Sequence, residues 1–222
     1  MPGLSTQIRP VSDVMAEPLV RGELLRLVGL SWVDPEPLLT DAMTHVDSML
    51  LGRDEHQALV GFMTWRHHRF TLPSGQTLAA LYAGLGAIDA AWQGQGLGKQ
   101  VIYAAIEAGL AERAPADRAV VWSTTASPVG YLGLAKRFPK GFNPRPDGSY
   151  DAEALPLLEV LKPVLKTQPA HTDEHPFVLR GFSQKRYAPL TQNALSQVQV
   201  PLFTRIDERN GDRLLLLFDA QP

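Results

Sequence analysis

The chain has 222 residues, of which 45% are hydrophobic, enough for one sizeable core. Its 21 basic and 23 acidic residues give a net charge of −2, which disfavours nucleic acid and anionic membranes as partners. The absence of cysteine excludes disulfides, thiolate metal sites and a cysteine nucleophile. With neither an apolar signal core at its start nor a run of about 20 apolar residues, the sequence predicts a soluble, cytoplasmic protein without a metal site.

The first fifth of the chain predicts a short strand followed by two helices. Residues 1–16 are polar and rich in turn formers, with a strand expected around 6–11. Proline at the first turn and apolar residues at helical spacing predict a helix over 18–29. Asp34, followed by proline, is typical of an N-cap and predicts a second, shorter helix over 34–45.

The middle of the chain predicts antiparallel strands that lead into a helix. Apolar runs separated by charged or proline-glycine turns indicate strands over 48–52, 58–71 and 76–89. The last of these becomes apolar and rich in small residues from Leu81, which predicts a buried strand. The apolar positions then change to helical spacing over 97–110.

The following segment predicts a second strand and helix. Residues 119–125 are rich in β-branched side chains, and Ser127, followed by proline, is typical of an N-cap for a helix over 129–138. The order strand, helix, strand gives one crossover with parallel central strands. We therefore expect one α/β domain over 1–222, with a motif core at about 45–140.

The C-terminal part, residues 141–222, predicts fewer regular elements. Proline-rich residues 139–149 indicate an extended surface connection. A helix is expected over 153–165, a strand over 177–182, and a last strand over 213–218 after the turn at Asn210-Gly211. We interpret this part as an extension of the same domain.

A loop with glycine at positions 94, 96 and 98 precedes the predicted helix. Glycine allows backbone N–H groups to approach a ligand, and the first turn of a helix has N–H groups without intrahelical partners. This loop therefore predicts an anion site, with a phosphate or pyrophosphate as the natural ligand. A dinucleotide fingerprint would need glycine where Lys99 stands, and a P-loop would need glycine at Gln93 and a hydroxyl residue at Gln100.

The spacing that fits is Gln93-x-x-Gly96-x-Gly98, with the apolar Ile88 five residues before the glutamine. This pattern resembles the acetyl-CoA loop of the GNAT superfamily of N-acetyltransferases. The resemblance implies that coenzyme A pyrophosphate lies on the backbone N–H groups of Gln93, Gly94, Gln95, Gly96, Leu97, Gly98 and Lys99. It also implies that pantetheine lies along the strand end, at Ala87, Ile88 and Asp89. Relatives often place asparagine after the next strand, and this chain has Thr125 and Ser127 in that stretch as candidates for pantetheine contact.

The resemblance also implies the catalytic groups. A backbone N–H around Ile88 or Asp89 would polarise the acetyl carbonyl. Tyr131, on the helix after the second strand, is the candidate proton donor for the thiolate, and the alternative is a packing tyrosine whose hydroxyl bonds a neighbour. Relatives often place a base on the strand before the loop, where this chain offers Tyr82 and Asp89.

The neighbouring strand contains His67 and His68, which face opposite ways because strand side chains alternate. We take His67 as a candidate base, and a water chain as an equal alternative.

The sequence thus predicts an α/β protein of GNAT fold, with a mixed, mostly antiparallel central sheet, flanking helices and a splayed parallel pair at the cofactor site. The predicted activity is transfer of acetyl from acetyl-CoA to an amine of a small molecule or protein by direct attack. A non-catalytic GNAT-fold module that binds acyl-CoA is the alternative, and a nucleotide-binding regulatory domain is a third. A homodimer is left open.

Overall fold

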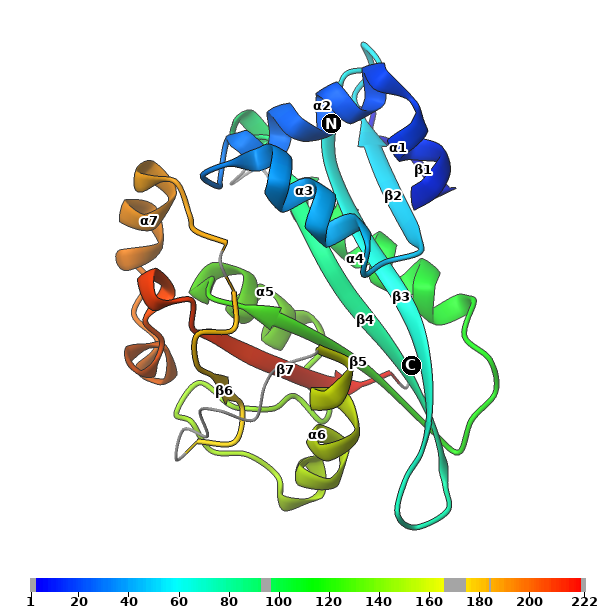
Figure 1. Ribbon diagram of the computed structural model, residues 1–222, viewed down its shortest axis with the longest axis vertical. Helices are drawn as coiled ribbons and strands as arrows, with labels where there is room; N and C mark the ends of the chain where they lie inside the picture. The colour runs from blue at the N-terminus through cyan, green and yellow to red at the C-terminus, as the bar shows by residue number, and fades with distance from the viewer. Residues whose placement is uncertain (1–2, 93–96, 166–174, 184, 221–222) are drawn as a thin grey trace. The chain divides into compact units, whose positions relative to one another are not determined.

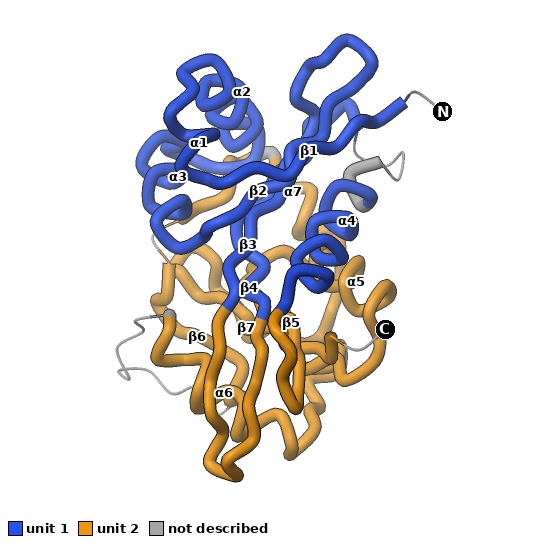
Figure 2. The backbone as a smooth tube through the Cα atoms, turned by 90° about the vertical axis from the view of Figure 1, so that its right-hand side faces the viewer, with its two compact units in different colours: residues 1–67, 81–113 blue, residues 68–80, 114–222 orange. Residues whose placement is uncertain are grey.

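The computed structural model describes residues 3–92, 97–165, 175–183 and 185–220. The chain divides into two compact units (Figure 2). The first unit comprises residues 1–67 and 81–113, and the second comprises residues 68–80 and 114–222. The hairpin of the two longest strands contributes residues to both units.

The described strands form a mixed sheet of seven strands in the order β1-β2-β3-β4-β5-β7-β6. The neighbours pair antiparallel except for the parallel pair β4–β5. The predicted α/β class, with a mostly antiparallel sheet and flanking helices, is confirmed. The strands are β1 (Ser5–Pro10), β2 (Ser48–Arg53), β3 (Leu59–Thr71), β4 (Thr77–Ile88), β5 (Arg118–Thr125), β6 (Val178–Leu179) and β7 (Arg213–Asp219).

Helices cover both faces of the strands in the first unit (Figure 1). They are α1 (Val11–Ala16), α2 (Pro18–Gly29), α3 (Pro35–Met43) and α4 (Leu97–Ala111). Helices α2 and α3 bury Leu24, Leu27 and Leu39 in one core cluster with Met49 and Leu51 of β2, and α1 adds Val14 to this cluster. Because side chains alternate along a strand, Gly52, the residue after Leu51, faces the opposite side, where α4 packs.

Helix α4 approaches β2 closely at Gly52, next to a β-bulge between β2 and β3. Gly52 pairs with Gly61, but Arg53 pairs with Leu59, so β3 has one extra residue at Val60. A Cβ atom added to Gly52 would lie 2.7 Å from Cγ2 of Val101 on α4. The absence of a side chain at this position therefore fixes the distance between α4 and β2.

We expect Gly52→Ala to lower the free energy of unfolding by about 1–3 kcal/mol, because the added methyl group overpacks the contact with Val101. Gly22→Ala is the matched control in α2, where an added Cβ meets nothing within 4 Å. The free energy of unfolding of that variant should rise by about 0.5–1 kcal/mol, because alanine lowers the flexibility of the unfolded chain. Urea unfolding measures both, and a Gly52→Ala protein as stable as the wild type would contradict the packing described.

The second unit is built on the antiparallel pair β5–β7. Its register joins Val120 to Asp219 and Thr125 to Leu214. Residues 214–218 are all buried. The surrounding elements are α5 (Pro128–Arg137), α6 (Leu155–Leu161) and α7 (Pro189–Ser196), with short 3-10 turns at Ala152–Ala154, Lys162–Leu165, Pro201–Arg205 and Glu208–Asn210.

Several predicted elements have different bounds in the structure. The helix expected over 153–165 is α6 between two 3-10 turns, and Pro163, which lacks an N–H, lies beyond its end. The strand expected over 177–182 is only Val178–Leu179, because Gly181 turns the chain with φ +56°. Helices α1 and α7 were not predicted. Asp34 is the residue before α3 as predicted, but its side chain makes no cap hydrogen bond.

In the part of the chain that the structure describes, no helix has the length and apolar character needed to cross a membrane.

Candidate functional site

The predicted strand before the glycine motif and the predicted helix after its start are both present in the first unit. Strand β4 ends at Ile88, a 3-10 turn, η1, spans Ala90–Trp92, and α4 begins at Leu97. The predicted residues Gln93, Gly94, Gln95 and Gly96 lie outside the described residues. For Leu97, Gly98 and Lys99 the structure describes only the helical backbone.

The end of β4 determines which backbone groups could polarise a carbonyl. Ala87 is buried, and Ile88 and Asp89 are half-buried. The Asp89 N–H donates a 2.8 Å hydrogen bond to the Val60 carbonyl at the bulge of β3. This N–H, one of the two candidates for an oxyanion-type donor, is therefore engaged in the structure.

The two hydroxyl residues predicted to contact pantetheine, Thr125 and Ser127, lie in the second unit at the C-terminal end of β5. The Ser127 N–H donates to the Thr125 hydroxyl at 2.9 Å. The Ser127 hydroxyl in turn accepts from the Gly130 N–H at 3.1 Å, which confirms the predicted N-cap of α5. Both hydroxyl groups thus order the turn between the strand and the helix.

Tyr131 is completely buried in the second unit. Its hydroxyl donates a 2.6 Å hydrogen bond to the Pro144 carbonyl, and its ring makes edge contacts with Phe142 and Phe203. Burial, with a smaller contribution from Asp147, raises the pKa of the Tyr131 phenol well above its usual value. These contacts are those of the packing alternative, and a role as proton donor would require the hydroxyl to leave Pro144.

We expect Tyr131→Phe to destabilise the protein by about 1–3 kcal/mol, because it leaves the Pro144 carbonyl without its donor. From the packing geometry we expect turnover within about threefold of the wild type, whereas loss of a general acid would lower it about 10²–10⁴-fold. Chemical unfolding and steady-state kinetics measure the two effects. Tyr150→Phe, at a partly exposed tyrosine of the same unit, is the control. A large loss of turnover in Tyr131→Phe alone would assign the tyrosine to catalysis.

The two remaining catalytic candidates lie on long strands. His67 is exposed on β3, and Tyr82 is half-buried on β4 against the hydrophobic core of the first unit. The neighbouring His68 is in the second unit, where its ring lies 5.9 Å from both the Phe70 and the Trp122 rings. The assignment of His67 or Tyr82 as the base stays a prediction.

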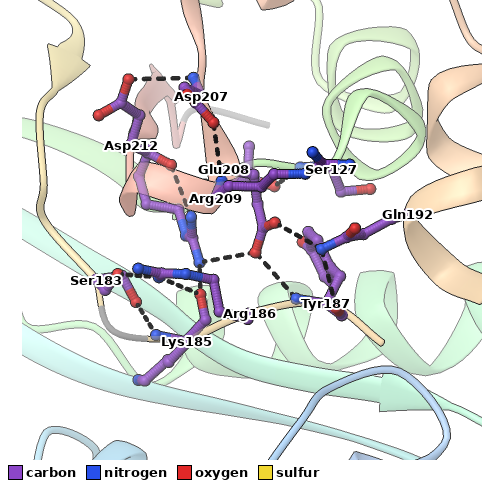
Figure 3. A network of polar contacts seen from close by, with 12 residues as sticks. Ser127, Ser183, Lys185, Arg186, Tyr187, Gln192, Asp207, Glu208, Arg209 and Asp212 are labelled. Atoms are coloured by element: carbon purple, nitrogen blue, oxygen red, sulfur yellow. Dashed lines mark hydrogen bonds and ion pairs between the residues drawn. The ribbon is translucent and has the colours of Figure 1, made fainter. Parts of the chain in front are cut away.

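A polar network next to the end of β5 was missed by the sequence analysis (Figure 3). At its centre, the Arg213 guanidinium donates to the carbonyls of Asp212 (2.7 Å) and Lys185 (2.5 Å) and lies 3.8 Å from the Glu208 carboxylate. Glu208 also accepts from the Tyr187 N–H at 2.9 Å and from the Gln192 amide at 3.1 Å. A lone arginine at the start of a strand of leucines was the only sequence signal of this cluster.

This network reaches the predicted cofactor residues through Tyr187. Burial raises the pKa of Tyr187 to about 12, although the nearby Arg213 guanidinium and Thr125 side chain oppose the shift. Burial also lowers the pKa of Arg213, with Tyr187 and Glu208 opposing that shift. Tyr187 is therefore neutral near pH 7 and is the member of the network nearest to Thr125.

No protein-family model matches the sequence, and a search of curated proteins found no significant match. Solved structures to which the chain is similar include a GNAT family N-acetyltransferase, YhbS, from Escherichia coli in complex with CoA. It is 19% identical, with a TM-score of 0.39, and the match covers 55% of this chain and 64% of that one. An IAA acetyltransferase from Bacillus cereus is 15% identical, with a TM-score of 0.46 and coverage of 98% and 99%. A GCN5-related N-acetyltransferase from Kribbella flavida is 13% identical, with a TM-score of 0.41 and coverage of 64% and 33%.

Proposed function

We propose that this chain is an acetyl-CoA-dependent N-acetyltransferase that transfers acetyl by direct attack to an amine of a small molecule or protein. The observation that carries the proposal is the motif Gln93-x-x-Gly96-x-Gly98, which follows β4 in the sequence and whose last residue, Gly98, lies in the first turn of α4. This strand-to-helix context is the one in which such a motif acts as an anion site.

The donor groups at the start of α4 fit the pyrophosphate of coenzyme A. The first N–H groups of a helix have no intrahelical partner and carry partial positive charge. The first turn of α4 contains Lys99 and no acidic residue. An anion at the start of this helix would therefore meet backbone N–H donors, and the first turn of α4 adds no acidic residue.

The thioester of acetyl-CoA supplies the activated acetyl group. In the proposed reaction the amine nitrogen forms a bond to the acetyl carbon, the bond from that carbon to sulfur breaks, and the proton lost by the amine balances the proton gained by the thiolate. The α4 N-terminus would hold the pyrophosphate, and Ala87 and Ile88 would align the pantetheine. His67 or a water chain would accept the amine proton.

Release of free thiol from acetyl-CoA in the presence of a panel of primary amines and peptides tests the activity. The proposal predicts thiol release that depends on both the protein and the amine. Thiol release equal to the rate without protein for all amines, in a preparation that binds CoA, would contradict catalysis.

The alternative function is a CoA-binding module without catalysis. Two groups assigned to catalysis are engaged elsewhere, since the Asp89 N–H donates to Val60 and the Tyr131 hydroxyl donates to Pro144. Such a module would bind CoA and acetyl-CoA with similar affinity and release no thiol in the amine panel.

A further inference from the structure

Helix α2 is connected to the strand ends of the first unit by two charged side chains one turn apart. Glu23 accepts from the Leu59 N–H at 3.3 Å, and Arg26 donates to the Leu59 carbonyl at 2.7 Å. Both polar backbone groups of Leu59, the first residue of β3, are therefore held by α2. Arg53 of β2 holds Glu23 in place through two hydrogen bonds, of 2.7 and 3.0 Å.

Arg26 also reaches the end of β4. Its Nη1 donates to Oδ2 of Asp89 at 2.5 Å, across 63 residues of sequence. The other carboxylate oxygen of Asp89 accepts from the Ala91 N–H at 3.1 Å, and the Asp89 carbonyl accepts from the Trp92 N–H at 2.9 Å. One residue thus binds Arg26 on one side and orders the η1 turn on the other.

The η1 turn is the last described segment before Gln93, the first residue of the proposed coenzyme A loop. Its direction fixes where that loop begins. Asp89 is only 20% exposed, whereas Arg26 is 48% exposed, so the carboxylate depends on the arginine for much of its charge compensation.

We propose that Arg26 and Asp89 form a positioning pair that ties α2 to the entrance of the coenzyme A loop, so that its loss weakens cofactor binding more than it weakens the fold. This inference rests on the proposed function. Arg26 acts through Asp89 and η1 and is a positioning residue, not a catalytic one.

The pair stays ionised under the conditions of a binding assay. Burial by itself raises the pKa of Asp89, but the Arg26 guanidinium and the Ala91 N–H outweigh it and lower the pKa below its usual value. A depressed folded-state pKa means that the interaction is present above about pH 4 and is lost only as the pH falls through the folded-state value.

Calorimetry with CoA on four variants tests the inference. Arg26→Gln removes the cation, and Asp89→Asn removes the charge but keeps an oxygen that can accept from Ala91. We expect each to raise the Kd for CoA roughly tenfold, because the loop entrance is no longer held. The double variant should bind CoA with the same Kd as the single variant that binds more weakly, because both changes break the same interaction. Arg26→Lys keeps a cation that cannot hold Asp89 and Leu59 together, and it should bind with intermediate affinity.

Arg21→Gln is the matched control, because Arg21 lies on the same helix and forms an exposed ion pair with Glu36 of α3. It should leave the Kd for CoA unchanged. Thermal unfolding should place Arg21→Gln within about 3 °C of the wild type, because an exposed ion pair contributes little to stability. The Arg26 and Asp89 variants should unfold cooperatively and well above the temperature of the binding measurement.

Two results would overturn the inference but not the proposed function. The first is a Kd for CoA in Arg26→Gln within twofold of the wild-type value. The second is a double variant whose loss of affinity is the sum of the two single losses, which would mean that Asp89 contacts the cofactor independently of Arg26. Failure of the wild-type protein to bind CoA would instead overturn the proposed function, and this inference with it.

Discussion

Glu208→Ala should lower the free energy of unfolding by about 3–5 kcal/mol, because it leaves a buried arginine without its carboxylate. Arg213 is only 6% exposed, and Glu208 provides a carboxylate 3.8 Å from its guanidinium. The same substitution also removes the acceptor of the Tyr187 N–H and the Gln192 amide. Urea unfolding of the purified protein measures the loss.

Two variants control for this effect. Glu208→Gln keeps an oxygen acceptor and removes only the charge, so its free energy of unfolding should fall by less than that of Glu208→Ala. Glu153→Ala removes a carboxylate from an exposed position of the same unit and should change stability by less than about 0.5 kcal/mol. A Glu208→Ala protein as stable as Glu153→Ala would show that Arg213 is satisfied by the backbone carbonyls alone.

Gly96→Asp should weaken CoA binding at least tenfold, about 1.4 kcal/mol, because it inserts a carboxylate among N–H groups proposed to hold an anion. Gly96→Ala adds a side chain without a charge, so it measures the steric part of the effect and should lose less affinity for CoA than Gly96→Asp. Gly22→Asp adds the same charge to α2, at a position where a Cβ meets nothing within 4 Å, and should leave the affinity unchanged. Unchanged affinity in a folded Gly96→Asp protein would place the cofactor elsewhere.

The parts of the fold that could be predicted from sequence are those determined by neighbouring residues. The change from strand to helical periodicity identified β4 and α4, and serine followed by proline identified the N-cap of α5, which Ser127 forms with the Gly130 N–H. Each of these signals lies within a few residues of the structure that it specifies. The glycine motif could be interpreted as an anion site because it lies between a predicted strand and a predicted helix.

The parts that could not be predicted depend on contacts between distant residues. Nothing near Tyr131 in the sequence indicates that its hydroxyl bonds the Pro144 carbonyl. Arg26 and Asp89 are paired only because α2 packs beside the ends of β3 and β4. The bulge at Val60, which engages the Asp89 N–H, depends on the pairing register between β2 and β3.

The central claim, that the chain binds coenzyme A through the loop before α4, is tested most directly by thermal unfolding with acetyl-CoA, CoA, ATP and NAD in parallel. A ligand at a hundredfold excess over its Kd stabilises by about 2.7 kcal/mol, which is a readily measured shift. We predict that acetyl-CoA and CoA raise the unfolding temperature and that Gly96→Asp abolishes the shift. No shift with either CoA species, or a shift with ATP or NAD instead, would contradict the claim.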